Sequence, residues 1–208
     1  MFAANKDSML LLHTCCAPCS AAILEWLLAN NIRPTLFFYN PNIFPQEEYE
    51  IRKNDLKRYA QLLDLEFIDG DYSHESWLAG IKGLETQPER GARCLECFKM
   101  RLLATAQLAQ EKGFTQIATT LASSRWKNLE QIETAGQWAV SHFPAVEFWA
   151  KNWRKDGLSE RRQILLSENG FYNQTYCGCE FSACSKSAIK SPESSKPTDK
   201  RNIPSPAN

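Results

Sequence analysis

Three features are missing from this sequence, and each absence narrows the class of protein. No apolar run approaches the roughly 20 residues that a membrane-spanning helix needs. Residues 1–7 lack the apolar stretch of a secretory signal. There is no excess of charge of either sign, since Lys and Arg together number 24 and Asp and Glu also number 24. We therefore expect a cytoplasmic protein without a membrane partner, and the neutral total still permits a local basic patch.

The 208 residues suffice for one sizeable domain. Short apolar segments predict strands at 9–12, 36–39, 65–68, 116–120 and 146–149. Amphipathic or strongly helical segments predict helices at 21–28, 46–64, 77–82, 94–112, 129–140 and 161–168. Strand and helix alternate, with short turns between them. This alternation predicts an α/β sandwich with a mainly parallel sheet of about five strands.

The composition changes near residue 185. Beyond that point Ser, Pro and Lys dominate, and apolar periodicity ends. We therefore predict a single α/β domain over residues 1–184 and a disordered tail over residues 185–208. Cys184 lies at the edge of this tail and is expected to be incidental.

Cysteine is the most informative residue type. The reducing conditions of the cytoplasm argue against a structural disulfide framework as the use of the eight cysteines. They form three short clusters in distant parts of the chain: Cys15, Cys16 and Cys19; Cys94 and Cys97; and Cys177, Cys179 and Cys184. This distribution predicts that the clusters converge on one site.

The first cluster lies in the turn between the first strand and the first helix, which Ser20 is expected to cap. In an open α/β sheet, ligands bind at this end of the strands. A helix N-terminus also favours thiolates. Three cysteines within five residues at this point indicate a metal or cluster site more strongly than three small buried side chains.

Cys94-x-x-Cys97 opens a helix, so both thiols lie on one side of its first turn. Together with Cys15 and Cys16 they supply four thiolates, enough for a [4Fe–4S] cluster or a zinc ion. Spacing alone does not separate the two. The adjacent pair Cys15-Cys16 is unusual for zinc sites, and this favours the cluster.

Cys177-Gly178-Cys179 is a different arrangement, because the central glycine lets the backbone bend sharply between the thiols. It fits a redox-active pair that cycles between dithiol and disulfide, or two ligands of a second metal. The sequence leaves both open.

Several other side chains are weaker candidates. Asp69 and Asp71 follow the third strand, where turn and capping roles are common for acids. His13 precedes the cysteines and fits a buried core histidine equally well. A phosphate-binding rim is predicted from six cations: Arg90, Arg93, Arg125, Lys127, Arg161 and Arg162.

These motifs together resemble the QueH family of epoxyqueuosine reductases. The matching segments, spread over residues 9–182, are Leu12-His13-Thr14-Cys15-Cys16-Ala17-Pro18-Cys19-Ser20, Tyr39-Asn40-Pro41-Asn42-Ile43, Arg93-Cys94-Leu95-Glu96-Cys97-Phe98, Thr119-Thr120-Leu121, Lys127-Asn128 and Tyr176-Cys177-Gly178-Cys179-Glu180-Phe181-Ser182. The family tends to have Ser-Pro in the central turn, where this chain has Ser123-Ser124-Arg125-Trp126.

The resemblance implies a Rossmann-like fold of the HUP and PP-loop group. It also implies a cytoplasmic iron–sulfur oxidoreductase that converts epoxyqueuosine to queuosine at the wobble position of tRNA, the last step of queuosine biosynthesis. Carried over by motif, Cys15, Cys16, Cys94 and Cys97 would hold a [4Fe–4S] cluster. Cys177 and Cys179 would be the redox-active pair or would bind an adjacent mononuclear iron. The electron donor is unidentified.

The reaction suggests further roles. Removing an epoxide oxygen to leave an alkene takes two electrons and two protons, and releases water. A second redox element beside the cluster would therefore be chemically sensible. Asp71 or His13 is a candidate acid for the departing oxygen. The tRNA would bind through phosphate contacts and present a splayed base.

Two other functions remain as alternatives. One is a PP-loop-like enzyme that uses ATP for sulfur transfer, although the turn Thr14–Ser20 lacks the Ser-Gly-Gly-x-Asp-Ser type of phosphate cradle. The other is a zinc-stabilised nucleic-acid-binding module. Iron with brown absorbance would exclude the zinc module, whereas zinc in a colourless protein would support it.

Overall fold

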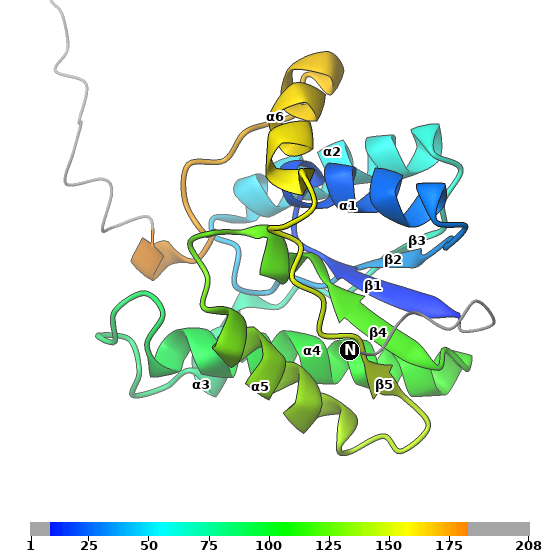
Figure 1. Ribbon diagram of the computed structural model, residues 1–208. Coiled ribbons are helices and arrows are strands. Elements are labelled where there is room, and N and C mark those ends of the chain that lie inside the picture. Colours follow the sequence, from blue (N-terminus) through cyan, green and yellow to red (C-terminus); the bar gives the residue numbers. More distant parts are fainter. Residues whose placement is uncertain (1–8, 183–208) are drawn as a thin grey trace, which may run out of the picture.

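The structure is a computed structural model that describes residues 9–182 (Figure 1). The predicted tail and Cys184 lie outside the described residues. The elements follow in the order β1 (Leu10–Thr14), α1 (Ala17–Ala29), β2 (Thr35–Phe38), α2 (Gln46–Leu62), β3 (Phe67–Asp69), α3 (His74–Gly80), α4 (Ala92–Lys112), β4 (Gln116–Thr119), the 3-10 helix η1 (Thr120–Ser123), α5 (Leu129–Val140), β5 (Glu147–Phe148) and α6 (Leu158–Asn169).

The five strands form one parallel sheet in the order β3-β2-β1-β4-β5. β2 and β3 follow β1 on one side of it, and β4 and β5 lie on the other side. The strand order therefore reverses between β1 and β4, where Leu12 is in register with Ala118 and His13 with Thr119. In open α/β sheets the crevice beyond the carboxyl ends of two such strands is the usual ligand site.

Helices cover both faces of the sheet, which makes three layers. Figure 1 shows α1, α2 and α6 on one face and α3, α4 and α5 on the other. Two interhelical contact regions, α1 with α6 and α4 with α5, accompany this division. The predicted α/β sandwich with a mainly parallel sheet is confirmed, and the sheet is in fact parallel throughout.

The core is centred on β1, whose five residues are all buried. A strand covered on both faces has no polar side, which explains the continuous apolar run Leu10-Leu11-Leu12. The ring of Trp26, on α1, packs edge-on or tilted against the rings of Trp149 and Trp153, which follow β5 and also contact each other. Among residues 9–182, no helix combines the length and the apolar character needed to cross a bilayer.

The start of α1 differs from the prediction. The helix begins at Ala17, with Cys16 as its N-cap, so the expected capping role of Ser20 is wrong. Proline is favourable in a first helical turn, and Pro18 therefore extends the helix back to the strand. The Ser20 hydroxyl instead donates to the Cys16 carbonyl at 2.8 Å. As a consequence Cys19 lies inside the first turn of the helix.

Candidate functional site

A cavity of about 610 Å³ opens beyond the carboxyl ends of β1 and β4. Cysteines from all three sequence clusters line it: Cys15, Cys19, Cys94, Cys177 and Cys179. The Cys15 sulfur lies 3.7 Å from the Thr120 hydroxyl. Because Cys15 follows β1 and Thr120 follows β4, this contact links the carboxyl ends of the two strands. The predicted convergence of the three clusters is thus confirmed.

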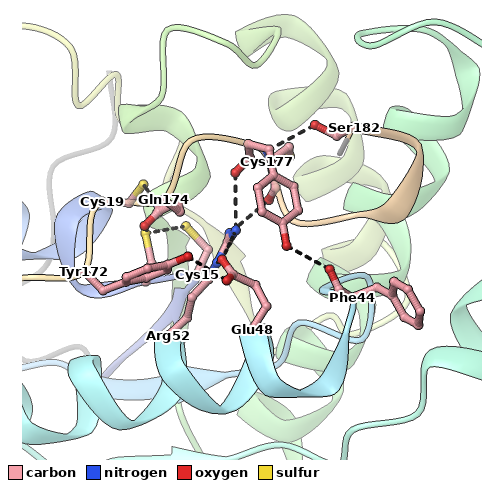
Figure 2. Close-up of polar contacts among 11 residues, drawn as sticks. Cys15, Cys19, Phe44, Glu48, Arg52, Tyr172, Gln174, Cys177 and Ser182 are labelled. Carbon is pink, nitrogen blue, oxygen red and sulfur yellow. Dashed lines mark hydrogen bonds and ion pairs between the residues drawn. The ribbon is translucent and has the colours of Figure 1, made fainter. Parts of the chain in front are cut away.

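Cys15, Cys16 and Cys19 form the most compact group of thiols. Their sulfur atoms all lie within 4.8 Å of one another, and all three residues are buried. Cys15 directly follows β1, Cys16 is the N-cap of α1 and Cys19 lies within the first turn of α1, so a single strand-to-helix junction positions the group. Figure 2 shows Cys15 and Cys19 at this junction. Such a group can hold a metal.

The three thiols are electrostatically unequal. Donation from the S–H groups of Cys16 and Cys19 lowers the pKa of Cys15 well below its usual value, although burial opposes this. Burial raises the pKa of Cys16, and the hydrogen bond to Cys15 raises that of Cys19 to about 11. Within the group, Cys15 is therefore the thiol that ionises most readily.

Lys127 supplies a compensating positive charge. Burial lowers the pKa of its ammonium group, but the attraction of Cys177, Cys15 and Cys19 outweighs burial and raises that pKa above its ordinary value. The lysine follows η1, so the β4 end of the crevice provides a cation for the thiols at the β1 end.

Cys94 and Cys97 enter from the first turn of α4, as predicted. The backbone N–H of Arg90 donates to the Cys94 sulfur at 3.3 Å, and Cys94 lines the cavity. Cys97 is buried beside Cys179 and Trp77. Cys19, rather than either of these two, completes the compact group with Cys15 and Cys16. The four-ligand set that includes Cys94 and Cys97 therefore stays a prediction.

Cys177 and Cys179 lie on a loop that follows α6, and both are free thiols in the structure. Gly178 between them has φ of +120°, a backbone conformation that favours glycine. Burial, reinforced by Cys177 and Cys97, raises the pKa of Cys179 to about 12. The Cys177 N–H donates to the Ser182 hydroxyl at 3.1 Å. The loop thus presents two free thiols on a defined backbone.

Arg52 of α2 holds this loop in place (Figure 2). Its guanidinium donates to the carbonyls of Cys177 and Tyr176, at 3.2 and 3.4 Å, and lies 5.0 Å from the centre of the Tyr176 ring. A buried ion pair with Glu48, at 2.6 Å, orients the guanidinium. Glu48 in turn accepts from the Tyr172 hydroxyl at 2.8 Å.

Replacing Arg52 with methionine should lower the free energy of unfolding by about 3–5 kcal/mol, because Glu48 would stay buried without its counter-ion. Urea unfolding followed by circular dichroism measures the change. Arg33→Met is the matched control, since the side chains of its pair with Asp64 are 58% and 102% exposed. That control should cost at most about 1 kcal/mol. Equal losses in the two variants would contradict a structural role for the buried pair.

Gln174 connects the same C-terminal segment to the first cysteines. Its side-chain N–H donates to the Cys16 sulfur at 2.8 Å and approaches the Cys19 sulfur at 3.8 Å. Amide donors of this kind favour a negatively charged sulfur. The segment that carries Cys177 and Cys179 thereby also contributes to the environment of the compact group.

The two candidate proton donors, His13 and Asp71, lie in different parts of the structure. His13 is fully buried in β1, and burial lowers the pKa of its ring to about 3. Its nitrogens contact the Thr119 hydroxyl at 2.8 Å and the Tyr39 carbonyl at 3.1 Å, so it is a hydrogen-bonded core histidine. Asp71 is exposed after the edge strand β3 and does not line the cavity. Its role as a proton donor stays a prediction.

The cavity wall is strongly cationic. Arg52 and Arg154 line it. So do five of the six predicted cations: Arg90, Arg93, Arg125, Lys127 and Arg162. Arg161 instead pairs with Glu25 at 2.7 Å and does not line the cavity. Within residues 9–182, Glu89 is the single carboxylate in the lining. Such a wall suits a polyanionic ligand.

Comparisons with known proteins give a consistent result. The family model "Epoxyqueuosine reductase QueH" matches residues 10–185. A protein of Acinetobacter baylyi named epoxyqueuosine reductase QueH is 47% identical over 86% of this chain and 81% of its own length. Proteins of the same name from Haemophilus influenzae and Thermotoga maritima are 45% and 38% identical, over 86% and 83% of this chain and 73% and 88% of their own lengths. The cysteine-lined crevice is therefore that of a family member: the chain belongs to the QueH epoxyqueuosine reductase family.

Proposed function

We propose that this protein reduces epoxyqueuosine to queuosine at the wobble position of tRNA. The observation that supports the proposal most is the convergence of thiols from three parts of the chain on one cation-lined cavity at the β1/β4 crevice. Thiols supply redox chemistry and metal ligation. The cationic wall suits the phosphates of RNA. The relatives carry the name of the same activity.

The thiols fit an iron–sulfur cofactor. Cys15, Cys16, Cys94 and Cys97 would hold a [4Fe–4S] cluster, since soft thiolates are its preferred ligands and three of these four residues are buried. Lys127 and the Gln174 amide would stabilise the thiolate charge. When bound, such a cluster supplies electrons one at a time.

Cys177 and Cys179 would serve as the second redox element. Oxidation of two thiols to a disulfide releases two electrons and two protons, which equals the requirement for converting an epoxide to an alkene and water. Burial keeps Cys179 in its protonated form, with a pKa of about 12, so the pair retains a proton for the departing oxygen. An electron donor would then return the disulfide to the dithiol. The alternative use of the pair, as ligands of an adjacent mononuclear iron, predicts a fifth iron per chain.

The cationic wall would hold the anticodon loop. Phosphate contacts orient an RNA without reading its sequence. A modified base must leave the stack to reach a thiol at the bottom of a crevice. The cavity, at about 610 Å³, has the volume of a typical small-ligand site and accommodates a single splayed nucleoside.

Replacement of Cys19 with serine tests the ligand set. If Cys15, Cys16, Cys94 and Cys97 bind the cluster, Cys19→Ser protein purified without oxygen should keep about four iron and four sulfide per chain. Iron and acid-labile sulfide analysis measures this. Loss of the cluster would instead place Cys19, the third member of the compact group, among the ligands.

The function itself is tested with tRNA that contains epoxyqueuosine, a chemical reductant and protein purified without oxygen. Formation of queuosine, detected by mass spectrometry of the digested nucleosides, is the expected result. Zinc without sulfide, even after anaerobic reconstitution, would favour a zinc-stabilised nucleic-acid-binding module.

A further inference from the structure

We propose that Trp126 is a stacking platform for a base of the anticodon loop next to the modified nucleotide, and that it determines how tightly the tRNA is held. This inference rests on the proposed function. Trp126 is 58% exposed and lines the cysteine cavity. Of the large apolar side chains that are exposed in residues 9–182, it alone lines that cavity.

The backbone beneath Trp126 is held by two arginines. Arg90 donates to the carbonyls of Arg125 and Trp126, at 3.1 and 3.0 Å. Arg154 donates to the carbonyls of Ser124 and Lys127. Four consecutive carbonyls, from residue 124 to residue 127, therefore accept hydrogen bonds from guanidinium groups. A segment held in this way presents its side chain with little conformational freedom left to lose on binding.

The surroundings of the ring favour RNA over an apolar partner. The Arg125 guanidinium lies 5.0 Å from the ring centre, and further cations line the cavity around it. An aromatic face among cations matches an unstacked base with its flanking phosphates. Trp126 and the neighbouring Lys127 line the same cavity as Cys15 and Cys177, so a base on Trp126 would be close to the nucleotide being reduced.

The first test compares steady-state kinetics on epoxyqueuosine-containing tRNA for the wild type, Trp126→Ala and Trp126→Phe. Loss of one stacked base should raise KM on the order of tenfold to a hundredfold, with kcat changed less than about twofold. Phenylalanine should restore most of the affinity, because the aromatic face is retained. Trp138→Ala is the matched control, since Trp138 is exposed on α5 but does not line the cavity.

A spectroscopic readout separates stacking from a general loss of affinity. An anticodon stem-loop carries 2-aminopurine at either position that flanks the modified nucleotide, and its fluorescence is recorded at saturating protein. Wild-type protein should quench one of the two probes, and Trp126→Ala should abolish that quenching. Unchanged KM and unchanged quenching in Trp126→Ala, with active wild type, would overturn this inference alone. Wild-type protein that binds the stem-loop but forms no queuosine would overturn the proposed function.

Discussion

Replacing Cys15 with serine should abolish the iron binding that we propose for these thiols and should lower the formation of queuosine by more than about 100-fold. Cys15 is the thiol whose pKa is lowered within the compact group, and it directly follows β1 at the point where the strand order reverses. A serine hydroxyl is a poor ligand for iron and stays protonated. The result is measured as iron and sulfide per chain, together with nucleoside analysis of the tRNA.

A matched control separates this effect from the general loss of a thiol. Cys184 lies outside the described residues, at the edge of the predicted tail. Cys184→Ser should retain both iron and activity. A Cys15→Ser protein with wild-type iron content and rate would remove the compact group from the proposed site.

Replacing Gly178 with alanine should lower the rate of queuosine formation by about 100-fold, because small displacements of reacting groups have effects of that size. At φ of +120°, a residue with a side chain has a strained backbone. The added Cβ would also lie 3.0 Å from Ile43 Cγ1 and 3.1 Å from Arg52 Nη1. Arg52 is fixed by Glu48, so it has little room to yield. The loop should shift together with Cys177 and Cys179. Backbone strain should also lower the free energy of unfolding by about 1–3 kcal/mol.

Gly113→Ala distinguishes strain from misplacement of the thiols. Gly113 ends α4 with φ of +76°, and an added Cβ would meet nothing within 4 Å. It precedes β4, at the opposite end of the sheet from the cavity. This variant should lose about 1 kcal/mol of stability and keep its full rate. The two rates are compared by single-turnover conversion, and the stabilities by thermal unfolding. A Gly178→Ala enzyme as fast as Gly113→Ala would mean that the loop tolerates displacement.

The sequence was sufficient for the fold and for the centre of the site, because both depend on local patterns. Apolar runs marked all five strands, and the cysteine spacing marked the three segments that meet at the cavity. Parallel strands bring their carboxyl ends to one edge of the sheet. The start of α1 is the exception. The capping preference of Ser20 predicts a later start, whereas Pro18 is favourable in a first helical turn and the helix begins at Ala17.

Local sequence patterns do not predict contacts between distant segments of the chain. Arg52 lies three residues after Tyr49 and four before Leu56, on the buried stripe of α2, and this was the one signal that could have singled it out. Its partner carbonyls are more than a hundred residues away. Gln174 has no distinguishing spacing at all. Asp71 fits a proton donor in the sequence, but it follows the edge strand β3 and lies outside the cavity lining. Arg161 fits a phosphate-binding residue, but it pairs with Glu25 and also lies outside the lining.

The proposed reductase activity is tested by the conversion of epoxyqueuosine in tRNA by the full chain, purified without oxygen and supplied with a chemical reductant. Nucleosides from the digested tRNA are quantified by mass spectrometry over time. We predict that queuosine appears as epoxyqueuosine disappears, and that Cys177→Ser protein forms none above background. Unchanged epoxyqueuosine in the presence of iron-loaded wild-type protein would contradict the proposed activity.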